Sequence, residues 1–223
     1  MNSTPLKSES LVLRNPKIIG NSSDPTEKYD LVYSIPYLAA YDVVGHQLRI
    51  ARPRNHKVAI PQEQFELTSR SLRVQNQTIG YRQALPTAHL TIQFTQIKNY
   101  RDLFSYIEDN ERIKRLAALA EEADKCFDSE AWTAYCVMAT GVIEGILGSF
   151  YGGKKTRYAT LLKTAYQSKI ISAQDYYILD KLCESEALIH VSNHDIPMTT
   201  KRTASAVNRV YWRVIRTDWN SEV

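Results

Sequence analysis

The spacing of the apolar residues changes once along this chain, near Lys98, and that change restricts the fold more than any other feature. Before Lys98 the apolar residues come in short runs, rich in β-branched and aromatic side chains and separated by turn-forming residues. After Lys98 they recur every three or four residues, and no proline lies between Pro86 and Pro197. We therefore expect an α+β protein in which residues 1–98 form a small β-rich domain and residues 99–223 form an all-α helical bundle.

The clearest strand in the first half is expected at His89–Ile97. In it Leu90, Ile92 and Phe94 alternate with polar residues, which is typical of a strand that is buried on one face only. The other expected strands contain the runs "LVL", "YDLVYSI", "HQLRIA", "KVAI" and "SLRVQ".

Short polar residues and glycines divide the second half into separate helices. Asp128 or Ser129 is expected to cap the start of a strongly apolar helix. That helix is expected to run to Phe150 and to end at Gly152 and Gly153. The other helices expected before residue 172 are residues 100–126, either continuous or broken near Asp109, and residues 156–169.

The composition is that of a globular protein, with 43% hydrophobic and 23% charged residues. Cys126, Cys136 and Cys183 lie far apart, which argues against a disulfide framework or a cysteine-based zinc site. The first residues lack the charged start and apolar run of a signal peptide, and no uninterrupted apolar run reaches about 18 residues. We therefore expect a soluble cytoplasmic protein that does not enter a membrane.

Basic residues are concentrated in the first half of the chain. Residues 1–98 hold 12 Lys and Arg against 7 Asp and Glu, whereas the remaining residues hold 16 against 17. The densest basic segment, "RIARPRNHK", can bind the phosphates of RNA or DNA without reading the base sequence. An excess of this size also serves solubility alone. The candidate nucleic-acid contacts in this segment are Arg49, Arg52, Arg54 and Lys57.

Two further sets of residues have both a nucleic-acid interpretation and a structural one. Tyr33, Tyr37 and Tyr41 offer faces on which bases could stack, but tyrosines at strand spacing also pack across strands. The expected final helix, from about Thr199 to Trp219, carries arginines that could line an RNA groove or could cover apolar surface with their aliphatic stems. These arginines are Arg202, Arg209, Arg213 and Arg216. The candidate contacts among them are Arg209 and Arg213.

The segment "LCESEALIHVSNHDIP" combines acidic residues with two histidines four residues apart. A capping box in "SAQD" (Ser172–Asp175) predicts the start of the helix that carries it. Helical spacing then puts Glu186 and His190 on the face that also holds Leu179. A carboxylate and an imidazole on a core-facing stripe need partners. Three alternatives remain open: an internal hydrogen bond, a metal site and a catalytic site.

For the metal site, Glu186, His190 and His194 could ligate one ion from successive helical turns. However, "HVSNH" has Val191 where the zinc-protease motif carries its catalytic glutamate, and Pro197 ends the helix close to His194. The sequence also lacks a glycine-rich phosphate loop, a nucleophile elbow and a dinucleotide fingerprint. We therefore expect neither a metal ion nor a cofactor.

The layout of residues 121–219 resembles the HEPN superfamily of small helical bundles: an apolar helix, a lysine-rich turn, a short helix, and a helix that ends in a histidine motif. The family motif is Arg, then Asn or another polar residue, a few apolar residues and His. In "SEALIH", His190 matches the histidine, whereas Ser185 stands in place of the arginine and Glu186 in place of the polar residue. Glu144 in "GVIEGIL" matches an acidic residue that some members carry on the apolar helix.

The resemblance implies a homodimer in which two copies of the motif face each other and cleave RNA without a metal ion. The catalytic candidates are then His190 as general acid or base, with Glu186 and Glu144 beside it. The missing arginine removes a cation that would bind phosphate, and two acids near His190 would hold the imidazole charged. We therefore expect a HEPN-like bundle whose ribonuclease chemistry is impaired or absent.

Such bundles often serve bacterial toxins and antiviral defence, so the resemblance implies that setting. We expect a nucleic-acid-associated binding or regulatory subunit of a defence complex, dimeric through its helical domain. The first alternative is an RNA endonuclease that uses His190 and an arginine from elsewhere in the chain. The second is a dimeric assembly protein that binds a partner protein of such a complex.

Overall fold

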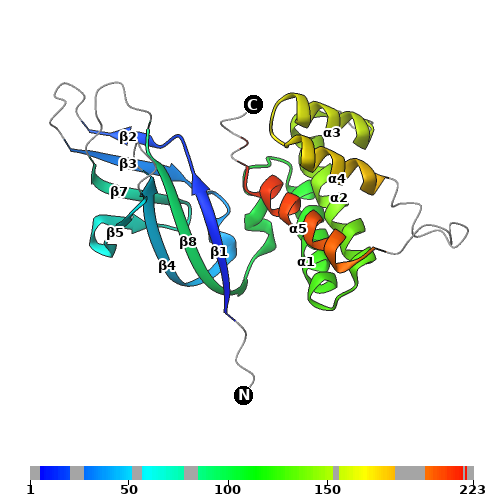
Figure 1. The fold of residues 1–223 in the computed structure, drawn as a ribbon, viewed down its shortest axis with the longest axis horizontal. Helices are drawn as coiled ribbons and strands as arrows, with labels where there is room; N and C mark the ends of the chain where they lie inside the picture. The colour runs from blue at the N-terminus through cyan, green and yellow to red at the C-terminus, as the bar shows by residue number, and fades with distance from the viewer. Residues whose placement is uncertain are drawn as a thin grey trace, which may run out of the picture. The chain divides into compact units, whose positions relative to one another are not determined.

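The computed structural model divides the chain into two compact units, Met1–Leu103 and Phe104–Val223. The first, here called the β unit, contains two antiparallel sheets, and the second, the helical unit, contains α-helices (Figure 1). The expected α+β class is confirmed. The structure describes residues 6–20, 28–51, 57–77, 85–152, 156–183, 199–217 and 219.

Each sheet of the β unit has four strands. Sheet A has the strand order β1-β8-β4-β5, and sheet B has the order β2-β3-β7-β6. The strands of sheet A are β1 (Lys7–Leu13), β4 (Tyr41–Ala51), β5 (Lys57–Ile60) and β8 (Thr87–Ile97). The strands of sheet B are β2 (Lys17–Ile19), β3 (Tyr29–Ser34), β6 (Phe65–Leu67) and β7 (Ser71–Gln77).

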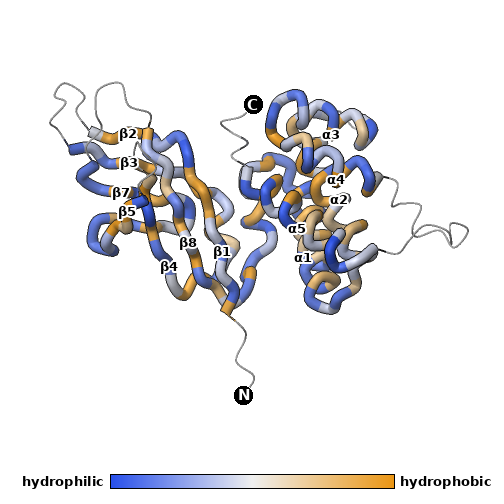
Figure 2. Tube along the Cα trace, in the orientation of Figure 1, coloured by the Kyte–Doolittle hydropathy of each residue, from blue (hydrophilic) through white to orange (hydrophobic). Residues whose placement is uncertain are grey.

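Alternating burial shows that one face of each sheet points to a core. Along β8 the residues Ala88, Leu90, Ile92 and Phe94 are buried, and the residues between them are partly exposed. The strand expected at residues 89–97 is therefore confirmed, and it begins two residues earlier. Figure 2 shows the same alternation as orange and blue segments along the strands.

The two sheets pack against each other through these apolar faces. The ring of His46 on β4 meets the ring of Phe65 on β6 edge to face, with 5.4 Å between the centroids. The hydroxyl of Tyr33 on β3 donates a hydrogen bond to the carbonyl oxygen of Pro86, just before β8, at 2.8 Å. Burial raises the pKa of Tyr33, so this phenol is a neutral donor. The outer face of sheet A is mostly polar, although it also carries the exposed side chain of Val12 on β1.

The described residues also form three short 3₁₀-helices, two in the β unit and one at the boundary between the two units. They are Leu38–Ala40, Gln62–Gln64 and Tyr100–Phe104. The helix Tyr100–Phe104 lies within residues 100–126, for which we expected either one continuous helix or two helices broken near Asp109. The Asp109 side chain then accepts hydrogen bonds from the amides of Glu111 and Arg112 and starts α1, so the expected break near Asp109 is confirmed.

The helical unit is built around α2, which packs against the other four helices. Seven of its residues are buried, and its glycines allow close approach: a Cβ added at Gly145 would lie 2.5 Å from Cδ2 of Leu116 on α1. The helices are α1 (Asn110–Asp128), α2 (Trp132–Tyr151), α3 (Tyr158–Gln167), α4 (Ala173–Cys183) and α5 (Lys201–Ile215).

The expected cap at the start of α2 is wrong. Asp128 is the last residue of α1, and the Ser129 hydroxyl donates to the carbonyl oxygen of Lys125, which satisfies an acceptor at the end of α1. Glu130 then takes a positive φ of 60°, which reverses the chain. These short polar residues therefore end one helix, and α2 starts at Trp132 without a side-chain cap. Its end at Tyr151, before Gly152, is as expected.

The capping box at the start of α4 is confirmed. The Asp175 amide donates to the Ser172 hydroxyl at 3.1 Å, and the Ser172 amide donates to the Asp175 carboxylate at 3.0 Å. Within the described part of the chain, α2 is the one helix that is long and apolar enough to cross a membrane by length and composition. Its buried contacts with four other helices are also those of the central helix of a soluble bundle.

Candidate functional site

One end of the outer face of sheet A gathers basic residues from several strands. Strand pairing brings Val12 beside His89 and His89 beside Arg49, so these side chains form one row across three strands. Lys57 pairs with Ala51, two residues beyond Arg49, and therefore points to the same side of the sheet. Arg14 follows β1 two residues after Val12, which places it at the same end. We call Arg14, Arg49, Lys57 and His89 the basic end of sheet A.

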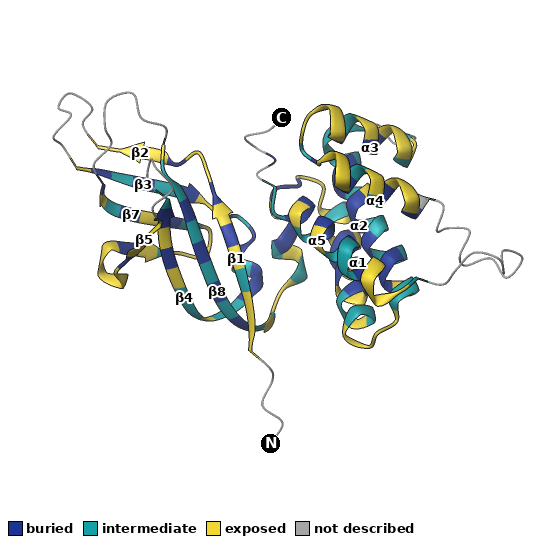
Figure 3. Ribbon diagram, in the orientation of Figure 1, coloured by how far each residue is buried: buried dark blue, intermediate teal, exposed yellow. Residues whose placement is uncertain are grey.

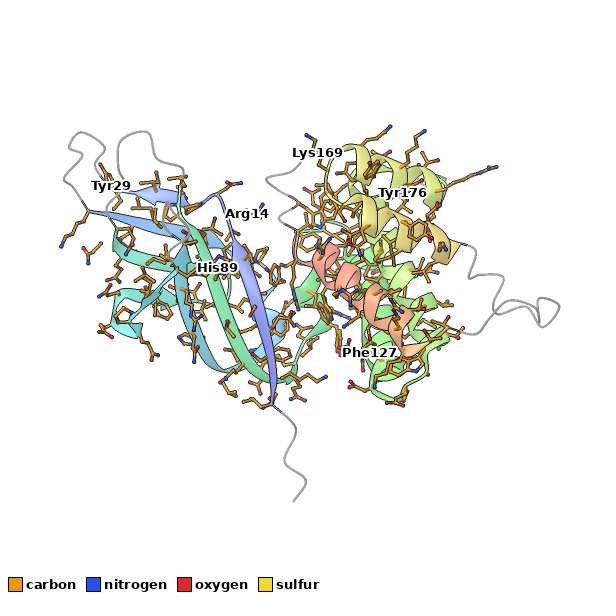
Figure 4. All side chains as sticks on the ribbon, viewed as in Figure 1. Arg14, Tyr29, His89, Phe127, Lys169 and Tyr176 are labelled. Carbon is orange, nitrogen blue, oxygen red and sulfur yellow. The ribbon has the colours of Figure 1, made fainter. Side chains whose placement is uncertain are left out.

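The pKa of His89 is affected by two of these cations. Its pKa is lowered, first by partial burial and then by the positive charges of Lys57 and Arg14. The imidazole is therefore neutral at pH 7, and one ring nitrogen remains available as a hydrogen-bond acceptor. Figure 4 shows His89 on β8 and Arg14 just after the end of the neighbouring strand β1.

The three cations are exposed and lack an acidic neighbour. Arg14, Arg49 and Lys57 are all exposed, and none has an ionic partner among the residues that the structure describes. Like charges on neighbouring strands destabilise a sheet. A bound anion would remove this repulsion.

The other end of the same face carries an acid. The Thr95 hydroxyl on β8 donates to the Asp42 carboxylate on β4 at 2.9 Å. Thr95 lies six residues after His89, which corresponds to about 20 Å along a strand. Between the two ends the face is uncharged, and Ser10 and Thr91 share a hydrogen bond of 3.3 Å there. The outer face of sheet A is therefore polarised along its length.

The four basic residues expected to contact nucleic acid are only partly described. Arg49 and Lys57 lie on one face, as a phosphate-binding surface requires, whereas Arg52 and Arg54 lie outside the described residues. Arg14 and His89 were missed from the sequence. Alternation did place His89 on the polar side of its strand, but the pairing of β1 with β8 gives no local signal.

The tyrosines of the first half do not form a stacking surface. Tyr33, Tyr37 and Tyr41 are 0%, 5% and 2% exposed, and the Tyr41 ring meets Phe94 edge to face with centroids 4.8 Å apart. The structural interpretation of these tyrosines is therefore correct. The basic end of sheet A can hold phosphates, and the described tyrosines do not supply it with a base-stacking face.

The arginines of α5 are used mainly within the helical unit. Arg213 donates to the carboxylate of Asp175, which is only 4% exposed, and this ion pair joins α5 to the start of α4. The pair neutralises Arg213, so its charge is less suited to a phosphate contact than that of exposed Arg209. Arg209 donates to the Ser205 carbonyl of its own helix at 3.3 Å. The guanidinium of Arg216 lies over the Trp212 ring, 4.6 Å from its centroid.

The histidine motif lies outside the described residues, and so do both of its candidate catalytic groups, His190 and Glu186. Glu144 is described and lies on the exposed side of α2, next to the buried Ile143. Solvent exposure is enough to explain a carboxylate in this apolar run. Within the described part of the chain, no group of three or more His, Cys, Asp or Glu side chains could hold a metal ion.

Comparisons of the chain with protein-family models, with curated proteins and with solved structures give no match. The chemical argument therefore starts from the geometry alone. Three exposed cations around a neutral imidazole can bind phosphate oxygens through charge-assisted hydrogen bonds. A flat sheet face with this pattern fits an extended polyanion better than a small enclosed ligand.

Proposed function

We propose that this protein is a nucleic-acid-binding subunit and that the basic end of sheet A contacts the phosphate backbone of RNA or DNA. One observation carries the proposal: Arg14, Arg49 and Lys57 surround His89 on one exposed sheet face, and none has an acidic partner among the described residues. Lys and Arg side chains that neutralise phosphates supply most of the sequence-independent affinity of such proteins.

The contact is expected to be independent of base sequence. Sequence is read by hydrogen bonds and apolar contacts to base edges, and positive side chains on a flat face reach the backbone instead. Binding should therefore weaken steeply with salt and should differ little between sequences of equal length and strandedness.

For the biological setting, we propose a regulatory subunit of a bacterial defence complex, cytoplasmic and dimeric through its helical unit. The support is the resemblance of residues 121–219 to HEPN bundles. The absence of the motif arginine at Ser185 favours binding or regulation over RNA cleavage.

The test is a binding titration with full-length protein, a labelled duplex and a labelled single strand over a range of salt concentrations. In Arg49→Ala/Lys57→Ala, we expect affinity to fall by about 10- to 100-fold, with a shallower salt dependence, because each lost phosphate contact lowers the slope by about 0.9 on duplex DNA. Lys17→Ala/Arg70→Ala is the matched control, since both side chains are exposed, Lys17 on β2 of sheet B and Arg70 in the turn just before β7. Equal losses in the two double variants would overturn the proposed surface.

The same titrations, repeated in EDTA and resolved on a denaturing gel, test the enzyme alternative. Cleavage by the wild type that disappears in His190→Ala would replace the binding subunit with a ribonuclease whose arginine comes from elsewhere. A wild type that binds neither nucleic acid at low salt would leave the assembly protein.

A further inference from the structure

Exposed aromatic rings gather in one part of the helical unit. Among the described residues the exposed aromatic side chains are Tyr166, 44% exposed, and Tyr177, 58% exposed. Tyr166 lies near the end of α3 and Tyr177 lies in the second turn of α4, and these two helices pack against each other. Figure 3 shows that both helices carry broad exposed strips.

Two tyrosine rings meet across the two helices. The ring of Tyr166 lies against that of Tyr176, with centroids 5.3 Å apart and planes inclined at 44°. On α4 the buried residues are Asp175, Leu179 and Leu182, so helical spacing puts Tyr177 on the opposite, outward side. Tyr177 is therefore presented to solvent beside a tyrosine pair.

Three lysines lie close to these tyrosines along the two helices, and one of them contacts a ring. The Lys181 ammonium lies over the Tyr177 ring, 4.6 Å from its centroid. Lys163 and Lys169 flank Tyr166 at intervals of three residues, and both are exposed. Lys169 occupies the turn after α3 with a φ of 61°, and its amide donates to the Tyr166 carbonyl at 3.0 Å (Figure 4). We call Tyr166, Tyr176, Tyr177, Lys163, Lys169 and Lys181 the tyrosine–lysine surface.

We propose that the tyrosine–lysine surface binds single-stranded nucleic acid by stacking bases on Tyr177 and Tyr166, with its lysines on the adjacent phosphates. This inference rests on the proposed function and adds the strandedness of the ligand. Aromatic rings beside positive side chains are the usual construction of single-strand sites, because every base has a face that can stack. The surface supplies exposed stacking faces, whereas Tyr33, Tyr37 and Tyr41 of the β unit are buried.

The lysines favour nucleic acid over a protein as the occupant. Tyrosine is common in both kinds of interface, but lysine is depleted at protein–protein contacts and neutralises phosphates in nucleic-acid complexes. Lys181 covers one face of the Tyr177 ring, and its side chain is exposed and long enough to move to a phosphate when a base stacks there.

The experiment measures the affinity of the full-length protein for a labelled oligouridine and for an RNA duplex of the same length at one salt concentration. Tyr177→Ala is expected to weaken oligouridine binding about tenfold and duplex binding less than about twofold. Tyr177→Phe keeps the ring and is expected to bind like the wild type. Because Tyr177 is exposed, its replacement does not remove a core residue, and circular dichroism checks the fold.

The outcomes separate this inference from the proposed function. Oligouridine affinity that is unchanged in Tyr177→Ala, or that falls equally for oligouridine and duplex, overturns the stacking surface. If duplex binding still depends on Arg49 and Lys57 in that case, the proposed function stands and only the stacking surface is rejected. If Tyr177→Ala instead changes only the molar mass in solution, the surface joins two copies of the chain and the inference is wrong. A wild type that binds neither ligand overturns both.

Discussion

Four basic side chains of the helical unit pair with acids of the same unit, whereas those at the basic end of sheet A have no ionic partner among the described residues. The helical pairs are Lys114 with Glu111, Lys125 with Glu121 and Glu122, Lys201 with Glu130, and Arg213 with Asp175. In the β unit, Arg73 pairs with Asp30 on sheet B, but Arg14, Arg49 and Lys57 form no salt bridge with any of the described residues.

The difference follows from how neighbours arise in the two architectures. On a helix, residues three or four apart share a ridge, so an acid and a base that are close in sequence pair locally. In an antiparallel sheet, the neighbours of β8 come from β1 and β4, which are distant in sequence. Like charges that meet across strands oppose folding. A basic cluster across strands is therefore better evidence of an anionic ligand than the same number of arginines on a helix.

The largest expected effect comes from breaking the buried pair of the helical unit. Asp175→Ala removes both the cap of α4 and the partner of Arg213, so we expect the free energy of unfolding to fall by about 2–3 kcal/mol. Far-UV circular dichroism during denaturant unfolding, which reports mainly the helices, measures it. Glu111→Ala removes an exposed pair and should cost about 0.5 kcal/mol or less. Similar losses in the two variants would show that burial does not distinguish the pairs.

The next effect compares the glycines of the two units. A Cβ at Gly145 would meet the buried Leu116 side chain at 2.5 Å, so Gly145→Ala should destabilise the helical unit by about 1–3 kcal/mol. A Cβ at Gly45 would meet the amide oxygen of Gln93 at 2.8 Å, and that side chain can turn away on the outer face of sheet A. Gly45→Ala should therefore change stability by less than about 0.5 kcal/mol.

A control within α2 separates steric clash from helix propensity. A Cβ at Gly141 would lie at an ordinary 3.6 Å from Cδ1 of Leu119. Alanine is the better helix former by about 1 kcal/mol, so Gly141→Ala should be neutral or stabilising. Thermal unfolding ranks the stabilities of Gly145→Ala, Gly45→Ala and Gly141→Ala. A destabilised Gly141→Ala would contradict the steric explanation.

The change of apolar spacing near Lys98 predicted the architecture because both periods are local. Alternation in β8, the cap at Asp109 and the box at Ser172 could all be found in the sequence for the same reason. The sequence does not specify whether a capping residue belongs to the helix before it or to the helix after it. Asp128 and Ser129 were assigned to the start of α2, but they end α1, because short polar residues occur at both ends of helices.

The candidate site was only half predictable. Arg49 and Lys57 belong to a visible basic segment, but their meeting with Arg14 depends on strand order, which no local pattern specifies. The pairing of Arg213 with Asp175 depends in the same way on helix packing. The sequence could not predict which segments that are distant along the chain contact each other.

A smaller effect is expected from pH at the basic end of sheet A. In the free protein the pKa of His89 lies below 6.5, because protonation is opposed by burial, Lys57 and Arg14. A bound phosphate chain reverses the local charge and raises this pKa, so binding takes up a proton. Affinity should therefore rise by about three- to fivefold as pH falls from about 7.5 to about 5.5.

The change in affinity with pH can be assigned to His89 directly. His89→Gln keeps a polar side chain without a titrating group, so its duplex affinity should be nearly independent of pH over this range. Calorimetry in buffers of different ionisation enthalpy measures the proton uptake of each protein. A pH dependence that is equal in the variant and the wild type would show that another group titrates.

The smallest effect concerns the exposed pair on sheet B. The pKa of Asp30 is lowered below 3.8, mainly by the hydrogen bond from Arg73, and the Asn76 amide adds a second hydrogen bond. The native state therefore binds this proton less readily than the unfolded chain, so the stabilisation is present above pH 3.8 and is lost as pH falls through the lowered pKa. Because Arg73 is 46% exposed, solvent screens the pair, and we expect only about 0.5 kcal/mol. NMR titration of the Asp30 carboxyl group, with and without Arg73→Ala, measures it. If Arg73→Ala shifted the unfolding free energy as much as Asp175→Ala, the contrast between the buried pair of the helical unit and the exposed pair of the β unit would fail.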